Sequence, residues 1–333
     1  MMKFKITQMI MLINYRWWEG IKMRKYIGLS IVACLSLSLA ACSGNSSSDA
    51  STTAGKVQIS TTDRLGNKVE LTEPPTSVAA LSPGDAETLM ELDANVVGVP
   101  TMTGKKPASF EGIQEIGNPH SPSLEQIAQV HPTVFFAQES FKQYANTLEN
   151  QSSKVVYTKA DSIEDIQENI TLFGDVLEKE QQATELNEEI SEHIETIEKN
   201  TDKVRALLVY GAPGTFLAAL PSSLSGDILE KAGGENIAAA FPKADQYPNY
   251  ASMSTEKIVE ANPEIVMLIT HSDPAAIKKA FEKEMNQNAA WKNLDAVKEK
   301  RVVVLSAELF GQNPGTKITE ALDEMTKQLD EVR

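Results

Sequence analysis

The chain has 333 residues and is acidic, with 46 aspartate and glutamate residues against 31 lysine and arginine residues and a formal net charge of −15. Such a charge argues against binding to nucleic acid or to an anionic membrane surface. The length predicts about two domain-sized units. The four histidines are too scattered along the chain for a zinc site with regular ligand spacing.

The N-terminal region contains a secretion signal. Arg24 and Lys25 precede an apolar run, Ile27 to Leu39, which has the length of a signal-peptide core and is too short to span a membrane. The run ends in Leu39-Ala40-Ala41-Cys42, which resembles a bacterial lipobox, a signal that is cut before a cysteine that then carries lipid. We therefore expect a lipoprotein signal peptide at residues 23–41, with an ordinary signal peptide and a chance cysteine as the alternative.

Processing at Cys42 has consequences for the mature chain. Residues 1–41 carry six Lys or Arg and one Glu, so their removal changes the net charge to −20 and leaves Cys42 as the single cysteine. The serine-rich stretch 42–56 is predicted to be a flexible tether. Lipid, rather than charge, is then expected to hold the protein at the membrane. Residues 1–22 fit nothing downstream, and we interpret them as a non-native extension.

The first half of the mature chain alternates short apolar runs with amphipathic segments. A turn at Leu65-Gly66-Asn67 predicts a hairpin between the first two strands. The predicted strands are 56–60, 69–72, 77–81, 96–100, 133–137 and 154–158, and the predicted helices are 85–92, a helix from Ser123, and 140–150. This alternation predicts an α/β lobe with a largely parallel sheet over residues 57–178.

The second half, residues 202–333, repeats this organisation. The predicted strands are 204–211, 264–269 and 301–305, and the predicted helices are 225–232, a helix from Ser254, 274–285 and 316–332. The stretch SPSLEQIAQVHPTVFF (121–136) is echoed by SMSTEKIVEANPEIVML (252–268), with a shared Glu, Ile and Pro before an apolar strand. We therefore expect two lobes built on one plan.

A helical segment connects the two halves. Residues 162–200 contain almost no turn formers apart from Gly174. Apolar residues recur at helical spacing at Ala183, Leu186, Ile190, Ile194 and Ile197. We place a long amphipathic connecting helix at residues 179–201; the apolar stripe is too short for a coiled coil.

Several stretches carry a family resemblance over roughly residues 57–330: NPHSPSLEQI (118–127), GAPGTFLAAL (211–220), SGDILEKAGGENI (225–237), STEKIVEANPEIVML (254–268), and the long stretch 270–311 beginning THSDPAAIKKAF. The chain resembles the substrate-binding lipoproteins of iron-siderophore, haem and cobalamin ABC importers, and within them the Isd-type haem-binding lipoproteins of Gram-positive bacteria. The resemblance implies the class III periplasmic-binding-protein fold, in which two similar α/β lobes are joined by a long rigid helix and the ligand lies in a cleft between them.

The resemblance also implies a ligand, partners and a location. The ligand would be haem, that is ferric protoporphyrin, carried as cargo. The partners would be an ABC permease dimer with its ATPase and surface haem-relay proteins, and the carrier itself would be a monomer. It would be lipid-anchored on the extracellular face of the cell membrane.

Two histidines are candidate haem-iron ligands. His271 follows an apolar strand, where side chains face the crevice in which α/β proteins bind ligands. The matching histidine of the family is an axial ligand of the haem iron. Without the family resemblance, the alternative is that His271 is a solvated loop residue. His120 stands where the family carries its other ligand, a methionine, which implies bis-histidine, low-spin ferric haem with a lower reduction potential. The alternative for His120 is a helix-capping loop. Met253 is the alternative axial ligand; His131 is predicted to be structural and His193 solvated.

Haem propionates would suit helix N-termini, which offer unpaired N–H groups and partial positive charge. The candidate haem-pocket residues are Ser82, Ser121 and Ser222 at such N-termini, Met102, Phe216, Val78 and Phe310 as apolar walls, and Lys105 and Lys106 as cations.

Glu125 and Glu256 occupy the same place in the two echoing stretches, each in the first turn of a predicted helix. A carboxylate is favourable there, which is a sufficient local explanation. In the family the matching carboxylates dock onto arginines of the permease dimer, one lobe on each subunit, and we expect the same role here.

The alternatives are an enzyme and a siderophore carrier. The chain has no nucleophile elbow, phosphate-binding loop or zinc-protease motif, so we do not expect an enzyme. After residue 41 only four arginines remain, Arg64, Arg205, Arg301 and Arg333, whereas an anionic catecholate siderophore calls for a cationic pocket. A haem carrier is therefore preferred, with a ferric-siderophore carrier of the same family as the alternative.

Overall fold

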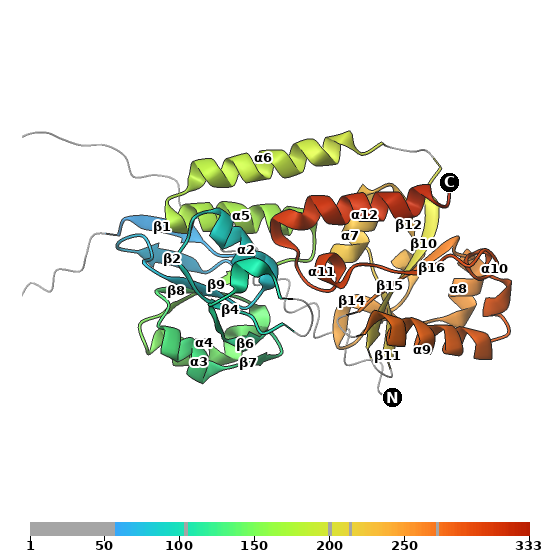
Figure 1. The fold of residues 1–333 in the computed structure, drawn as a ribbon, viewed down its shortest axis with the longest axis horizontal. Helices are drawn as coiled ribbons and strands as arrows, with labels where there is room; N and C mark the ends of the chain where they lie inside the picture. The colour runs from blue at the N-terminus through green and yellow to red at the C-terminus, as the bar shows by residue number, and fades with distance from the viewer. Residues whose placement is uncertain (1–56, 103–105, 199–201, 213–214, 271–272) are drawn as a thin grey trace, which may run out of the picture. The chain divides into compact units, whose positions relative to one another are not determined.

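The computed structural model describes residues 57–102, 106–198, 202–212, 215–270 and 273–333. The described residues belong to one compact unit, residues 54–333. This unit consists of an N lobe (β1 to α5) and a C lobe (β10 to α12), which helix α6 connects (Figure 1). The predicted signal peptide, Cys42 and the tether lie outside the described residues. Among the described helices, none is both long and apolar enough to cross a membrane.

The N lobe is built on a five-stranded parallel sheet in the order β5-β4-β3-β8-β9. Its strands are β3 (Val78–Ala80), β4 (Val96–Val99), β5 (Gln114–Glu115), β8 (Val134–Gln138) and β9 (Lys154–Thr158). Its helices are α2 (Pro83–Glu91), α3 (Leu124–Val130), α4 (Lys142–Glu149) and α5 (Ile163–Leu177), with 3-10 turns η1 (Ala108–Phe110) and η2 (Glu139–Phe141). The predicted parallel lobe is confirmed.

Two hairpins accompany this sheet. Strands β1 (Ile59–Thr62) and β2 (Lys68–Leu71) pair antiparallel across the predicted turn. The shorter pair β6 (Gly117–Asn118) and β7 (Ser121–Pro122), which the sequence did not predict, lies directly before α3.

The C lobe contains a seven-stranded mixed sheet in the order β13-β14-β11-β10-β15-β16, with β12 paired to β10. The strands are β10 (Val204–Ala212), β11 (Thr215–Ala219), β12 (Gly234–Asn236), β13 (Lys243–Ala244), β14 (Tyr247–Ser252), β15 (Ile265–Ile269) and β16 (Val302–Val304). The helices are α7 (Leu224–Lys231), α8 (Thr255–Ala261), α9 (Pro274–Gln287), α10 (Asp295–Lys298), α11 (Ala307–Phe310) and α12 (Ile318–Asp330), with 3-10 turns η3 (Ile237–Ala240), η4 (Trp291–Asn293) and η5 (Gly315–Lys317). Strands β11 and β14 run antiparallel to their neighbours. The C lobe therefore repeats only the parallel part of the N-lobe plan.

Serine side chains begin five of these helices. In each, the hydroxyl oxygen accepts a hydrogen bond from the backbone N–H three residues later, which satisfies one of the unpaired donors of the first turn. These N-caps are Ser82 on α2, Ser123 on α3, Ser162 on α5, Ser223 on α7 and Ser254 on α8.

The connecting helix is α6 (Glu180–Thr196), which lies within the predicted range. The segment before it is a separate helix, α5, because Glu178 takes a left-handed conformation with φ 54° and ends that helix. The two helices pack closely at Gly174, where an added Cβ would collide with the Cβ of Ala183. Gly174 therefore serves helix packing.

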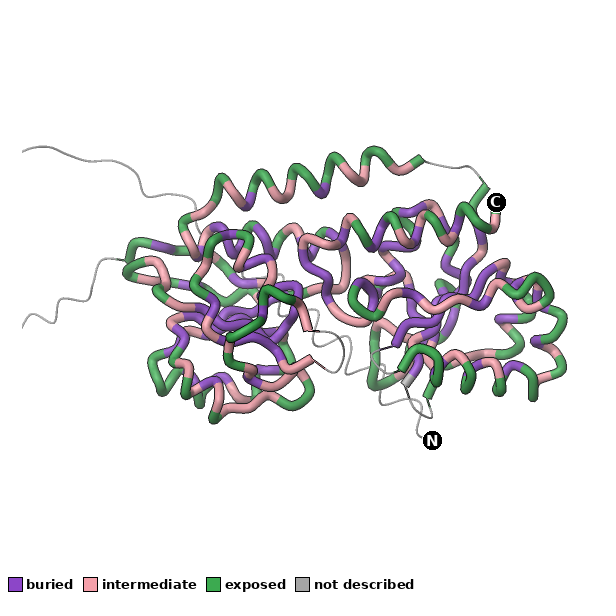
Figure 2. Tube along the Cα trace, in the orientation of Figure 1, coloured by how far each residue is buried: buried purple, intermediate pink, exposed green. Residues whose placement is uncertain are grey.

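A shared core also joins the lobes. One cluster of buried apolar side chains runs from Phe136 and Phe173 in the N lobe to Met267 and Leu322 in the C lobe, and buried segments occupy both lobes in Figure 2. Each lobe has a second cluster of its own. Burial of such side chains contributes roughly 1.5–3 kcal/mol each, so the lobes are held together by packing as well as by α6.

Candidate functional site

The carboxyl edge of the N-lobe sheet brings several predicted residues together. Ser82 follows β3, Met102 follows β4 and His120 follows β5, and these three strands are parallel neighbours. The backbone N–H of Thr101 donates to Gly117 O at 2.7 Å, which fixes the segment of Met102 beside the β6–β7 hairpin. In open α/β sheets this edge is where ligands bind.

His120 lies at the tip of the β6–β7 hairpin and is exposed. The Oδ1 atom of Asn118 accepts hydrogen bonds from the backbone N–H groups of His120 and Ser121, both at 3.0 Å, so the turn is fixed. The cap of α3 is Ser123, three residues further on. The imidazole is therefore not needed to cap the helix, and it makes no hydrogen bond or ion pair to any described residue.

In the C lobe the corresponding edge lies at the ends of β10 and β15. These strands are parallel, and Tyr210 is in register with Ile269. His271 lies outside the described residues, between buried Thr270 and Asp273. Asp273 caps α9 by accepting from the N–H groups of Ala275 and Ala276 at 2.9 and 3.3 Å. The predicted position after a buried parallel strand and before a helix is thus confirmed for the flanking residues.

The structure separates some of the other predicted pocket residues. Phe216 is in register with Gly211 at the carboxyl end of β10 and packs edge-on against Phe281, with ring centroids 5.1 Å apart. Ser222 lies beyond the opposite end of the same strand, β11, and its neighbour Ser223 is the actual cap of α7.

Three further candidates have packing roles. Val78 and Phe310 are buried in the shared core, at 1% and 5% exposure, so they do not form an open pocket wall. Met253 packs against the C-lobe cluster.

The remaining pocket candidates are polar. Ser121 is exposed in the hairpin beside His120, and Lys106 pairs with Glu115 at 3.1 Å. Lys105 lies outside the described residues.

Two tyrosines at the C-lobe edge were missed by sequence reasoning. The rings of Tyr210 and Tyr250 lie 5.5 Å apart at 58°. Burial raises the pKa of Tyr250 to about 12 and also raises the pKa of Tyr210, so both phenols are neutral at physiological pH. The sequence could have indicated Tyr210, because it lies near the end of the predicted strand 204–211. It gave no indication of Tyr250, because strand β14, which holds this residue, was not predicted.

Polar contacts cross from lobe to lobe. Asn249 Nδ2 donates to Asp161 Oδ1 at 2.8 Å, and the backbone N–H of Ile163 donates to Asp227 Oδ2 at 2.8 Å. Asn313 Nδ2 donates to Asp85 Oδ1 at 2.8 Å. Burial raises the pKa of the Asp85 carboxyl to about 7, although hydrogen bonds from Thr158, Asn313 and Ser82 lower it.

Glu125 and Glu256 occupy equivalent, exposed positions in helices of equal length. Helices α3 and α8 each start at a serine cap and end at a left-handed residue, His131 with φ 44° and Asn262 with φ 44°. His131 therefore has the structural role that the sequence predicted. The carboxylates are displayed by two copies of one helix–strand unit.

His193 corrects another expectation. Its Nε2 lies 2.9 Å from Asp323 Oδ1, which links α6 to α12, so it is a partnered residue and not a merely solvated one. Among the described residues, no group of three or more His, Cys, Asp or Glu side chains is arranged to hold a metal ion.

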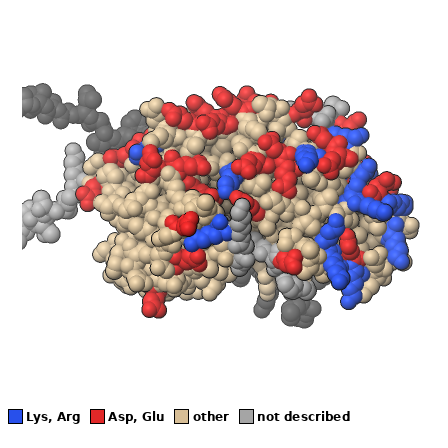
Figure 3. Space-filling model, in the orientation of Figure 1, with Lys and Arg blue, Asp and Glu red and all other residues tan. Residues whose placement is uncertain are grey.

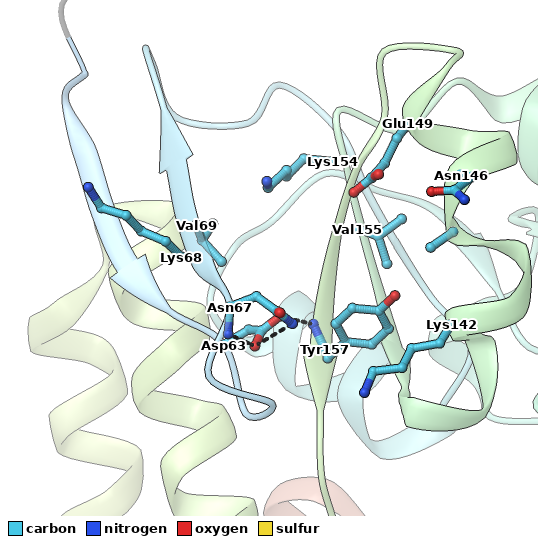
Figure 4. Close-up of a pocket in the computed structure, with 11 residues that line it drawn as sticks. Asp63, Asn67, Lys68, Val69, Lys142, Asn146, Glu149, Lys154, Val155 and Tyr157 are labelled. Atoms are coloured by element: carbon cyan, nitrogen blue, oxygen red, sulfur yellow. Dashed lines mark hydrogen bonds between the residues drawn. The ribbon is translucent and has the colours of Figure 1, made fainter.

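A hollow of about 300 Å³ lies elsewhere, on the N lobe between the β1–β2 hairpin, β9 and α4 (Figure 4). Asp63 in its wall accepts hydrogen bonds from the side chain of Asn67 and the backbone N–H of Tyr157. The bonds to Asn67 hold the turn of the hairpin, and the bond from Tyr157 fastens the hairpin to the edge strand β9. None of the predicted ligand or pocket residues lines this hollow, and its contacts indicate a structural role.

The chain belongs to the periplasmic binding protein family, whose sequence model matches residues 78–309. It is similar to the high-affinity heme uptake system protein IsdE of Staphylococcus aureus (strain Newman), with 31% identity over 256 residues, which are 75% of this chain and 84% of the relative. The resemblance that the sequence indicated is therefore confirmed.

Two crystal structures share the fold. An ABC transporter substrate-binding protein from Listeria monocytogenes EGD-e has a TM-score of 0.68 and 29% identity, over 78% of this chain and 100% of that one. Staphylococcus aureus IsdE complexed with heme has a TM-score of 0.67 and 29% identity, over 76% and 98%. The protein has the two-lobe α/β fold of class III periplasmic binding proteins, and its relatives are substrate-binding transport proteins, not enzymes.

Proposed function

We propose that this protein binds haem between its lobes and delivers it to the permease of an ABC importer for iron acquisition. The observation that carries the proposal is the similarity to IsdE, a heme uptake protein of which this chain covers 84%. The exposed, unpartnered imidazole of His120 at the carboxyl edge of the N-lobe sheet supports it.

Two histidines would hold the iron, one from each lobe. His120 would supply the N-lobe ligand and His271 the C-lobe ligand, which makes the bound haem six-coordinate and low-spin. Met253 is the weaker alternative because its side chain already packs against the C-lobe cluster. With both axial positions filled by protein, the iron has no open position for oxygen or peroxide, which suits a carrier.

Three of the four arginines after residue 41 favour haem over an anionic siderophore, and the fourth, Arg301, directly precedes β16. Arg64 pairs with Asp165 and Glu168, Arg205 with Glu264, and Arg333 with Asp330. These guanidinium groups are committed to internal ion pairs, whereas recognition of a catecholate would need them in the ligand site.

Anchoring and delivery complete the proposal. Lipid on Cys42 would hold the protein on the extracellular face of the cell membrane, and the segment 42–56 would tether the folded unit to it. Glu125 and Glu256 would dock onto basic residues of the two permease subunits. Their equivalent, exposed positions on α3 and α8 support this role.

The test is a titration of residues 54–333, which form one compact unit, with ferric haem, followed by visible absorption. The parent should give a sharp low-spin Soret band that saturates at one haem. His120→Ala and His271→Ala should each convert it to a high-spin or mixed-ligand spectrum. His193→Ala, which removes a histidine between α6 and α12, is the matched control and should leave the spectrum unchanged.

The outcomes separate the parts of the proposal. An unchanged spectrum in His120→Ala would remove His120 as a ligand while leaving haem binding intact. The absence of a saturable haem spectrum in the parent would overturn haem binding and direct the search to ferric siderophores.

A further inference from the structure

One region of this acidic protein is basic. Residues 274–301, from α9 to the start of β16, carry seven cationic and four acidic side chains, a net charge of +3 in a chain whose formal net charge is −15. Figure 3 shows lysine and arginine side chains gathered at the C-lobe end of the visible face, whereas acidic side chains lie mainly along its upper part. We call this region the basic surface.

The lysines of the basic surface are available. Lys279 and Lys283 are exposed and lie one helical turn apart on α9, on the same face. Lys292 is exposed in η4. None of these three side chains makes a hydrogen bond or ion pair to a described residue. In contrast, Lys298 pairs with Asp295 at 4.0 Å.

The basic surface adjoins the helix that carries Glu256. Thr255, the residue before Glu256, accepts hydrogen bonds from Asn288 Nδ2 at 3.1 Å and from Trp291 Nε1 at 3.4 Å. Asn288 ends α9, and Trp291 immediately precedes Lys292. The basic surface therefore lies next to the helix whose Glu256 is proposed to dock onto the permease.

We propose that the basic surface contacts the anionic phosphate headgroups of the membrane and thereby orients the C lobe over the permease. This inference rests on the proposed membrane location and docking role. The acidic net charge argues against a general attraction of the protein to an anionic membrane. At physiological ionic strength, however, charges act over only about 8 Å, so the charge of the contacting surface decides a local contact. A local excess of lysine is therefore attracted even though the rest of the surface is acidic.

The chemistry of the surface fits lipid better than an acidic protein. Six of its seven cations are lysines and one is Arg301. Lysine is a flexible point charge that suits a diffuse phosphate layer, whereas protein carboxylates are commonly recognised by the fixed, bidentate geometry of arginine. Among the described residues the exposed large apolar side chains are Val57, Tyr247 and Val259, and none of them lies within residues 274–301.

The experiment measures flotation of residues 54–333 with two kinds of vesicle, phosphatidylcholine alone and phosphatidylcholine mixed with phosphatidylglycerol. The parent should bind only the mixed vesicles and should be released at about 1 M salt, where the screening length is about 3 Å. The combined variant Lys279→Gln, Lys283→Gln and Lys292→Gln should bind about 100-fold more weakly.

The matched control has the same change in net charge at another place. Lys68→Gln, Lys142→Gln and Lys154→Gln alter lysines of the N lobe and should leave vesicle binding unchanged. Equal loss in both triple variants, or equal binding of the parent to both kinds of vesicle, would overturn the inference. So would failure of the parent to bind the mixed vesicles.

A haem titration of the same samples keeps the two proposals distinct. Normal haem spectra with no vesicle binding would reject the membrane contact alone. Vesicle binding that depends on Lys279, Lys283 and Lys292 without haem binding would support the contact and reject the cargo.

Discussion

Asn313 and Asp85 share a buried hydrogen bond, from Nδ2 to Oδ1 at 2.8 Å, although they are 228 residues apart and belong to different lobes. The other Asp85 oxygen accepts from Thr158 Oγ1 at 2.8 Å, and Asn313 Oδ1 accepts from the N–H of Gly315 at 2.9 Å. Gly84 lies so close to Gly315 that an added Cβ would collide with its backbone. The N-terminus of α2 and the segment before α12 are therefore joined by specific polar contacts as well as by apolar packing.

Asp85 should make the protein less stable as the pH rises from about 4 to about 7. Burial raises its pKa from 3.8 to about 7, so the folded state keeps a proton that the unfolded chain has lost in this range. The folded state then binds more protons, and the free energy of unfolding falls with pH. A shift of this size corresponds to about 4 kcal/mol.

Urea denaturation of the parent and of Asp85→Asn across this pH range would measure the contribution. In Asp85→Asn the free energy of unfolding should no longer fall between pH 4 and pH 7. In the control Glu164→Gln, which changes an exposed glutamate on α5, it should still fall. Equal pH dependence in the parent and in Asp85→Asn would show that Asp85 does not titrate in this range.

The protein should remain stable when the amide and the carboxyl group at positions 313 and 85 are exchanged, but not when the hydrogen bond between them is removed. Asn313→Ala leaves a buried carboxylate oxygen and the N–H of Gly315 without partners and should cost about 3 kcal/mol. In the double variant Asp85→Asn with Asn313→Asp, the amide at 85 can donate to the carboxylate at 313 and still accept from Thr158. Thermal unfolding should therefore place the double variant closer to the parent than either single variant. A double variant that loses the sum of the two single losses would contradict this pairing.

The parallel strands could be predicted because each is marked by a pattern of neighbouring residues in the sequence. Strands β8 and β15 are continuous apolar runs that follow an echoed Ser-x-x-x-Ile helix and a proline, and both are fully or almost fully buried. Strand β14 (YPNYAS) has three exposed residues and one buried residue, contains a proline and pairs at the antiparallel side of the sheet. It has neither an apolar run nor regular alternation, so tertiary pairing alone defines it.

The candidate site was predictable only in part for similar reasons. Serines cluster before α3 and α7. The sequence predicted a helix from Ser123 but also offered Ser121 and Ser222 as N-terminal residues, and the folded backbone shows that Ser123 and Ser223 are the caps. Sequence placed His120 in a loop before a helix, but not at the tip of a hairpin. The contact between Asp85 and Asn313 depends on residues too distant in the chain for any local pattern to indicate.

The identity of the residue at position 120 should tune the haem potential. His120→Met would give the His–Met ligand pair that the family resemblance implies, and methionine favours ferrous iron more than imidazole does. The reduction potential should therefore rise. Haem should remain bound and low-spin, because residue 120 is exposed on a fixed turn from which either a histidine or a methionine side chain can reach the iron. Spectroelectrochemical titration measures the potential, with His193→Ala as control. An unchanged potential in His120→Met would indicate that residue 120 does not ligate the iron.

Glu125 and Glu256 should act in transport and not in ligand binding. Both are exposed in the first turn of their helices, so replacement by glutamine should cost about 1 kcal/mol of stability or less. Each lost ion pair with the permease should weaken docking about tenfold. Because the two carboxylates lie on different lobes, the double variant Glu125→Gln with Glu256→Gln should impair haem-dependent growth much more than either single variant.

The control for this prediction changes the net charge equally at the far ends of helices. Glu149 ends α4 and Glu260 lies near the end of α8, and both are exposed, so Glu149→Gln with Glu260→Gln should leave growth on haem unchanged. The absorption titration must show normal haem spectra in all variants, since neither pair lies among the candidate ligands. Normal growth of the Glu125 and Glu256 double variant would assign the two carboxylates to local stabilisation of α3 and α8, whereas growth lost in both double variants would point to net charge and not to docking.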